Sequence, residues 1–184
     1  MNNHKPSEMI IMKDIKSMNT EKVIIKAYEK GFAYERDLGN CPQSMLATMQ
    51  DLFDIGGEEL LFKAATPFAG GGGRSTNGTC GALVGGMMTL GIIFGRNRKE
   101  WESEIVKEKA FTSAKELHDK FMEEYGGVLC KEIQQKIMGR SFDLTKEEDF
   151  QAFLDAGGHI NKCPGVVGKG AQWTAEIIVK DLEK

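Results

Sequence analysis

Four cysteines are the residues of this chain best suited to chemistry: Cys41, Cys80, Cys130 and Cys163. Thiolates bind soft metals and exchange with disulfides, so the sequence around each sulfur decides which chemistry is open to it. No Cys-x-x-Cys pair occurs, so zinc ribbons, thioredoxin-type motifs and c-type haem attachment are not supported. The four residues are either unrelated buried thiols or one site that the fold assembles.

The surroundings of Cys80 favour a site. A glycine-rich loop, residues 70–73, leads through Gly78 into residues 79–95, which carry no charge. Glycines on both sides of Cys80 leave its sulfur open to a partner, because they have no Cβ. A helix start also favours a thiolate, since free N–H groups and the helix dipole stabilise negative charge. These features predict that Cys80 lies at the centre of a redox or metal site.

Two other interpretations of residues 69–95 fit less well. A glycine loop before a helix is typical of phosphate binding, but Thr79 stands where a P-loop has its lysine. A membrane span needs about 20 apolar residues, and the uncharged run is shorter and is followed at once by Arg96. We therefore expect a buried central helix.

Helical periodicity covers most of the chain, and no segment shows the alternating pattern of a strand. The expected helices span residues 21–37, 42–53, 58–66, 79–95, 107–125, 131–138 and 143–153, with a last helix from Cys163; residues 96–101 are expected to be a charged connection. We predict an all-α fold, a compact multi-helix bundle around the glycine-flanked apolar central helix. Residues 1–18 are expected to be a weakly structured N-terminal lead-in, and residues 19–184 a single helical redox domain.

The composition indicates an ordinary globular protein of 184 residues, with 41% hydrophobic and 28% charged residues. The net charge is −3 and the basic residues are spread out, so the stripe that nucleic-acid binding requires is missing. The first 17 residues are polar and mixed in charge, and we therefore expect no signal peptide. A cytoplasmic location follows as an expectation, and there thiols are kept reduced.

All four cysteines fall near expected helix starts and close to a glycine or proline break, which for Cys130 is Gly126-Gly127. Cysteines that only pack in a core have no reason to choose such places. Ligands of an anionic cluster do, because converging N–H groups stabilise thiolates and sulfides. Zinc prefers closely spaced ligand pairs, whereas iron–sulfur clusters are held by four cysteine thiolates and tolerate long spacings. We therefore expect one site assembled from all four.

The same residues resemble the redox-active protein family named for its C…GCAxxG…C…C cysteine pattern. The resemblance covers about residues 28–178 and rests on Asn40-Cys41, FAGGG at 68–72, TCGALVG at 79–85, Leu129-Cys130, and CPGVV at 163–167 with Ala171 and Trp173. The core reads CGAxxG rather than GCAxxG, and Pro42 follows the first cysteine where we would look for alanine. Neither change removes a sulfur. Members look like small helical redox proteins, and similar domains occur beside haem modules in split-Soret-type cytochromes.

The resemblance implies a redox site in which the four cysteines hold an iron–sulfur cluster, 2Fe-2S or 4Fe-4S, in an electron carrier or oxidoreductase with an unidentified redox partner. Two alternatives stay open: a thiol–disulfide redox protein or sensor that uses the same cysteines without metal, and a structural helical module with a zinc site or inert thiols. We also expect a homodimer, because Gly81, Gly85 and Gly91 let another helix approach the central one.

Three further polar residues have two interpretations each. His118 and His159 lack metal-ligand spacing, so solvated side chains are expected, although His159 is close enough to Cys163 in sequence to orient a ligand. Arg74 either offsets the negative charge of a thiolate cluster or is a solvated loop residue.

Overall fold

The computed structural model describes residues 19–56 and 58–183, and these residues form an all-α protein, as predicted. Its helices are α1 (Thr20–Asp37), α2 (Cys41–Leu52), α3 (Glu58–Ala65), η2 (Thr66–Phe68), α4 (Gly81–Phe94), α5 (Arg98–Glu102), α6 (Glu108–Tyr125), α7 (Cys130–Met138), α8 (Glu147–Asp155), η3 (Gly158–Lys162) and α9 (Cys163–Leu182). The predicted lead-in, residues 1–18, lies outside the described residues.

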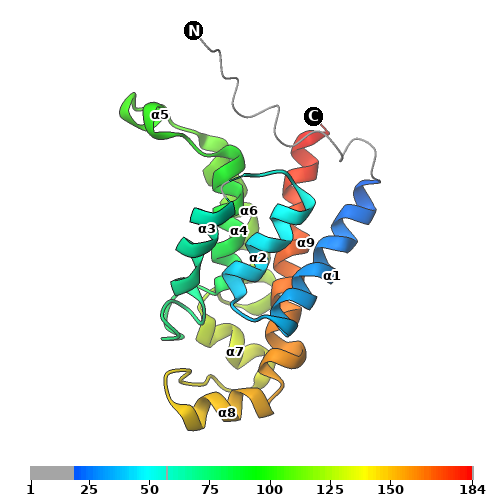
Figure 1. Ribbon diagram of the computed structural model, residues 1–184, viewed down its shortest axis with the longest axis vertical. Coiled ribbons are helices and arrows are strands. Elements are labelled where there is room, and N and C mark those ends of the chain that lie inside the picture. Colours follow the sequence, from blue (N-terminus) through cyan, green and yellow to red (C-terminus); the bar gives the residue numbers. More distant parts are fainter. Residues whose placement is uncertain (1–18, 57, 184) are drawn as a thin grey trace.

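The long helices lie side by side, while α7 and α8 close one end of the bundle and α5 extends from the other (Figure 1). The charge-free helix α4 is in the middle, in contact with α2, α6 and α9. Gly85 and Gly86 face these neighbours: a Cβ on Gly85 would lie 2.6 Å from Met45 Cβ, and one on Gly86 would lie 2.6 Å from Leu117. The expectation of a buried central helix is confirmed, and glycine sets how closely its neighbours approach.

This packing removes most of the glycine surface on which the predicted homodimer was based. Gly81 and Gly85 are covered by α2 of the same chain, so they do not receive a helix from a second copy. Gly91 is exposed, and a Cβ added there would meet nothing within 4 Å. Of the three glycines, only Gly91 remains open to a second copy, and self-association stays a prediction.

Helices α1 and α9 form the other close pair. Residues Val23, Ala27, Gly31 and Glu35 are the buried residues of α1 and follow one another at intervals of four. A Cβ on Gly31 would lie only 3.0 Å from Ala171 Cβ, so the two helices touch almost backbone to backbone. The Glu35 carboxyl group is an unusual member of this otherwise apolar stripe.

The structure differs from the sequence prediction at three connections. Residues 98–102 form helix α5, which is too short for a periodic pattern but is capped by Asn97 and Glu100 in both directions. Helix α8 begins at Glu147 rather than near Asp143, because the Asp143 carboxylate accepts a hydrogen bond from the backbone N–H of Thr145 and holds a turn there. A π-turn, η3, runs directly into α9.

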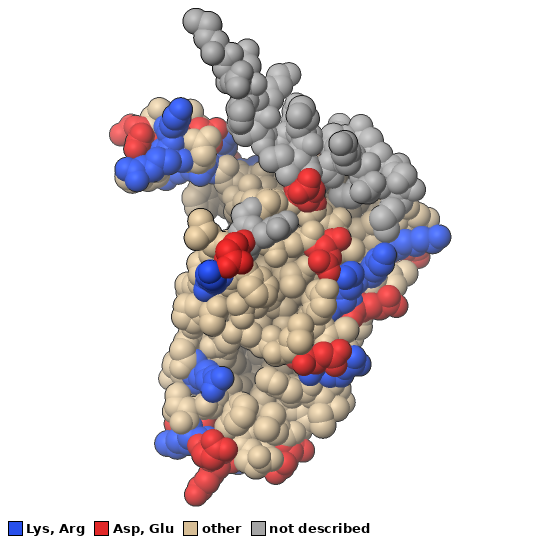
Figure 2. All heavy atoms as spheres, in the orientation of Figure 1, with Lys and Arg blue, Asp and Glu red and all other residues tan. Residues whose placement is uncertain are grey.

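Lys and Arg side chains lie beside Asp and Glu side chains over the face drawn in Figure 2, with no broad area of one sign. This mixed surface agrees with the absence of a basic stripe in the sequence. Among the helices that the structure describes, none is both long enough and apolar enough to cross a membrane.

Candidate functional site

The four cysteines begin four helices. Cys41, Cys130 and Cys163 are the first residues of α2, α7 and α9, and Cys80 immediately precedes α4. All four line a single cavity of about 430 Å³, and all four are free thiols. The structure thus brings together the residues that the sequence singled out; their role as ligands stays a prediction.

A small bridge between two loops joins Cys80 and Cys130. Thr79 and Leu129 pair as an antiparallel bridge. On either side, Cys80 N donates to Val128 O at 2.8 Å and Cys130 N donates to Gly78 O at 2.9 Å. Because Thr79 and Leu129 directly precede Cys80 and Cys130, this bridge holds the two cysteines near each other.

The glycine loop forms the wall beside these cysteines. Gly70, Gly71, Gly72 and Gly73 all have positive φ, between 57° and 78°, a conformation that other residues rarely adopt. A Cβ on Gly71 would lie 2.8 Å from Cys130 Cβ. At the start of α4, a Cβ on Gly81 would lie 2.3 Å from Cys41 Sγ. Glycine is required at both places so that backbone can lie against the cysteine side chains.

Burial raises the pKa of every one of these thiols. The pKa of Cys80 and of Cys130 rises to about 12, and those of Cys41 and Cys163 rise well above their usual range. The Glu35 carboxylate and the neighbouring thiols add to the effect, while the N–H groups of Ala82 and Leu83 oppose it at Cys80. The expectation that a helix start favours the thiolate is wrong for the metal-free site, because desolvation outweighs the helix termini.

Glu35 is a functional candidate that the sequence reasoning missed. It is 2% exposed, lines the cavity, and lies 3.0 Å from Ser44 Oγ through its Oε2. Burial raises the pKa of Glu35 to about 7, and the hydrogen bond with Ser44 lowers it only in part. The four-residue interval from Val23 through Ala27 and Gly31 was the signal that could have found it.

Gln134 was missed as well. Its side chain is buried; Nε2 donates to Cys130 Sγ at 3.7 Å, and Oε1 accepts from Phe142 N at 2.9 Å. The second contact fixes which end of the amide faces the sulfur, since a backbone N–H can only donate. Gln134 therefore orients Cys130 from one turn further along α7.

Other residues form the outer part of the cavity. Arg74 is exposed and lies 5.8 Å from the centre of the Phe150 ring. His159 is half-buried: it lines the cavity and packs edge-on against Phe153, so its side chain is only partly solvated. Burial lowers the pKa of His159, with Arg74 adding to the shift. His118, by contrast, lies partly exposed on α6 beside Asp119.

In the described ranges, 19–56 and 58–183, no group of three or more His, Cys, Asp or Glu side chains is arranged to hold one metal ion. Tetrahedral zinc–thiolate bonds of about 2.3 Å place ligand sulfurs roughly 3.8 Å apart.

Comparison with known proteins gives one match. The family model described as Putative redox-active protein (C_GCAxxG_C_C) matches residues 39–177, a range that includes all four cysteines and most of the chain. No curated protein and no solved structure matches. The resemblance found in the sequence is thereby confirmed, and the chain belongs to the C_GCAxxG_C_C family.

Proposed function

We propose that the protein is a small electron carrier or oxidoreductase whose four cysteines hold an iron–sulfur cluster, 2Fe-2S or 4Fe-4S. One observation carries the proposal: thiols from four separate helix starts line the same cavity. Four cysteine thiolates are the usual ligand set of both cluster types. Membership of a family described as redox-active supports the same conclusion.

The walls of the cavity fit such a group. Gly71 and Gly81 leave room beside the cysteines that any Cβ would fill. Backbone N–H groups of Gly70, Ala82 and Leu83 face sulfurs of the site. Converging N–H groups stabilise an anionic cluster and help set its reduction potential. A bound cluster would supply one-electron chemistry, while the chain holds it, limits water around it and offsets its charge.

The metal-free thiol–disulfide alternative is less well supported. Disulfide exchange proceeds through the thiolate of an accessible sulfur. Burial raises the pKa of all four thiols, and Cys80 and Cys130 are buried as whole residues. A metal ion overcomes such a pKa, because a coordinated thiol loses its proton outright.

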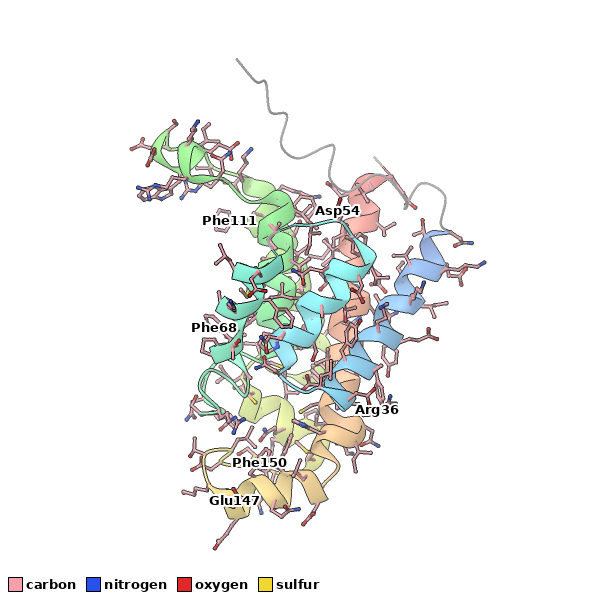
Figure 3. All side chains as sticks on the ribbon, viewed as in Figure 1. Arg36, Asp54, Phe68, Phe111, Glu147 and Phe150 are labelled. Atoms are coloured by element: carbon pink, nitrogen blue, oxygen red, sulfur yellow. The ribbon has the colours of Figure 1, made fainter. Side chains whose placement is uncertain are left out.

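The same proposal puts the protein in the cytoplasm, where a reducing environment would keep four unpaired thiols available for a cluster. It also includes a homodimer, supported by exposed apolar side chains. Phe68 and Phe111 lie on the same side of the molecule, at the edge formed by η2 and α6 (Figure 3). Surfaces of this kind mark interaction sites when they are contiguous.

Anaerobic purification tests the proposal. Iron, acid-labile sulfide and visible absorption should all be found in one sample, and dithionite should bleach the brown colour. A colourless protein with four titratable thiols would instead support the disulfide alternative, and zinc without colour would support the structural module. Cys80→Ala is the matched control, because it removes one proposed ligand.

A further inference from the structure

The first four backbone N–H groups of α7 are all used by carbonyl oxygens. They donate at 2.9–3.1 Å, in the pairs Cys130–Gly78, Lys131–Thr76, Glu132–Leu129 and Ile133–Leu129. A helix start normally offers such groups to a nearby anion. At α7 they are engaged elsewhere, so a sulfur that gains negative charge there needs another donor.

The sulfur of Cys130 has a side chain as its donor. At the start of α4, backbone N–H groups of Ala82 and Leu83 face Cys80. At the start of α7, Gln134 Nε2 donates a hydrogen bond to Cys130 Sγ at 3.7 Å. Because the two residues are four apart in the sequence, they lie on the same face of the helix. Gln134 thus supplies to Cys130 what the backbone supplies to Cys80.

A second contact fixes which end of the Gln134 amide faces the sulfur. Its Oε1 accepts a hydrogen bond from Phe142 N at 2.9 Å, and a backbone N–H can only donate. Phe142 is itself held firmly: it is buried, its ring centre lies 5.9 Å from that of Phe153, and the Arg140 guanidinium lies 4.4 Å from it. The amide therefore cannot turn its oxygen toward Cys130 without losing the bond to Phe142.

Little water reaches this contact. Gln134 is 2% exposed and Cys130 is 8% exposed, and both line the cavity that the four cysteines share. In such surroundings the effective dielectric constant is low, so a hydrogen bond to a charged acceptor is stronger than it would be in water. A change of charge on Cys130 Sγ would therefore change the strength of its bond with Gln134.

We propose that Gln134 raises the reduction potential of the centre that the cysteines hold, by donating its N–H to Cys130 Sγ. The proposal rests on the proposed function, because it requires a metal centre on Cys130. One electron enters the centre from a one-electron donor, no bond forms or breaks at Gln134, and its amide keeps both protons. The N–H···S bond strengthens as the sulfur becomes more negative, so it favours the reduced form. Gln134 is a positioning residue, since it acts through Cys130.

Redox titration of the anaerobically purified protein with dithionite, followed by visible absorption, tests the proposal. Gln134→Met has a similar shape but no donor. Its equilibrium constant for reduction should fall about three- to tenfold, which lowers the potential by about 30–60 mV for one electron. Gln135→Met is the matched control: Gln135 is exposed on the same helix, and its loss should change the constant by less than about twofold.

Gln134→Met also leaves Phe142 N without its acceptor, so a second variant separates the two contacts. Gln134→Glu keeps an oxygen for Phe142 N but presents an oxygen to the sulfur, and its equilibrium constant for reduction should fall by about tenfold or more. A potential equal to that of the unmodified protein in either variant would overturn the proposal. Loss of iron from both variants would also overturn it, because Gln134 would then be needed to build the site rather than to set its potential.

Nuclear magnetic resonance of the reduced, iron-free protein tests the contact itself. The side-chain N–H signals of Gln134, assigned from their loss in Gln134→Met, should shift in Cys130→Ala. The corresponding signals of Gln135 should stay in place. Gln134 signals that do not respond to Cys130→Ala would remove the contact on which the proposal depends.

The outcomes separate this proposal from the proposed function. A protein that holds neither iron nor sulfide would contradict both. Iron and sulfide, with a potential that does not depend on Gln134, would contradict this proposal alone.

Discussion

Replacing Glu35 by glutamine should make the iron-free protein more stable, and more so as the pH rises. A glutamate in an unfolded chain ionises near 4.5, whereas burial raises the pKa of Glu35 to about 7 in the folded protein. Between these values the folded state binds more protons than the unfolded state, so stability falls as the pH increases. This loss of folding stability is absent below pH 4.5, grows between pH 4.5 and about 7, and reaches its full size above pH 7.

The size of the effect follows from the same two values. A rise from 4.5 to about 7 corresponds to about 3 kcal/mol of stability lost once the carboxyl is ionised. Glutamine has no such penalty and can replace the neutral acid. Ser44 Oγ can donate its single hydrogen either to Glu35 Oε2, at 3.0 Å, or to Gly39 O, at 2.9 Å. It donates to Glu35 when the carboxyl is ionised; when residue 35 is neutral, the hydrogen can go to Gly39 O and Ser44 Oγ can accept a bond from residue 35. A glutamine N–H can donate that bond as the protonated acid does.

Urea unfolding at pH 5 and pH 8, on reduced anaerobic samples, measures the difference. We expect the two proteins to differ little at pH 5, and Glu35→Gln to be more stable by about 3 kcal/mol at pH 8. Glu29→Gln, an exposed change on the same helix, should show no such growth with pH. If Glu35→Gln follows the unmodified protein at both pH values, the burial argument for this carboxyl is refuted.

Four further outcomes are expected. Cys80→Ala and Cys80→Ser should lose most of their iron but keep their helical circular dichroism, because the apolar stripes of the helices do not depend on that sulfur; full iron occupancy in Cys80→Ala would exclude an essential ligand role. Gly81→Ala should cost about 1–3 kcal/mol of stability and reduce iron content, since its Cβ would lie 2.3 Å from Cys41 Sγ, whereas Gly91→Ala, with nothing within 4 Å, should be neutral or stabilising. The reduced iron-free protein should react with iodoacetamide at pH 8 much more slowly when folded than in urea, because burial raises the pKa of all four thiols; equal rates would contradict this. Light scattering at micromolar concentration should report a dimer, and a mass that stays near the 20.4 kDa of one chain would contradict the homodimer.

Most helices were predictable because they carry a periodic apolar stripe and their own boundary residues, while α4 was predictable as an uncharged run between glycines. Pro42 and Pro164 at helix starts, and Gly126 and Gly139 at helix ends, are local signals that no tertiary contact overrides. Helix α5 escaped prediction because its five residues cannot show a period, although its Asn97–Glu100 capping pair is visible in the sequence.

The cysteines were predictable for a different reason, since each lies within three residues of a glycine or proline break. Glu35 and Gln134 have no such marker. Both are polar residues inside helices, where a solvated face is the ordinary expectation. Only the packing of α1 against α9, and of α7 over the cavity, turns them inward. Residues of this kind are found from a sequence only by extending a buried stripe beyond its last apolar member.

The least predictable property is the charge that the site favours. Four helix starts lie around one cavity, and backbone N–H groups of Gly70, Ala82 and Leu83 face two of its sulfurs, an arrangement that suits an anion. Nevertheless the pKa of each thiol rises, because these N–H groups cannot offset the burial of four neighbouring sulfurs beside Glu35. Without a metal the cavity therefore favours neutral thiols, and the N–H groups beside Cys41 and Cys80 have no sulfur anion to stabilise. Metal cations change this balance, since they deprotonate the thiols and leave a net negative cluster for the N–H groups to bind. On this reasoning iron and sulfide should stabilise the fold, and the temperature of unfolding should rise when the iron-free protein is reconstituted.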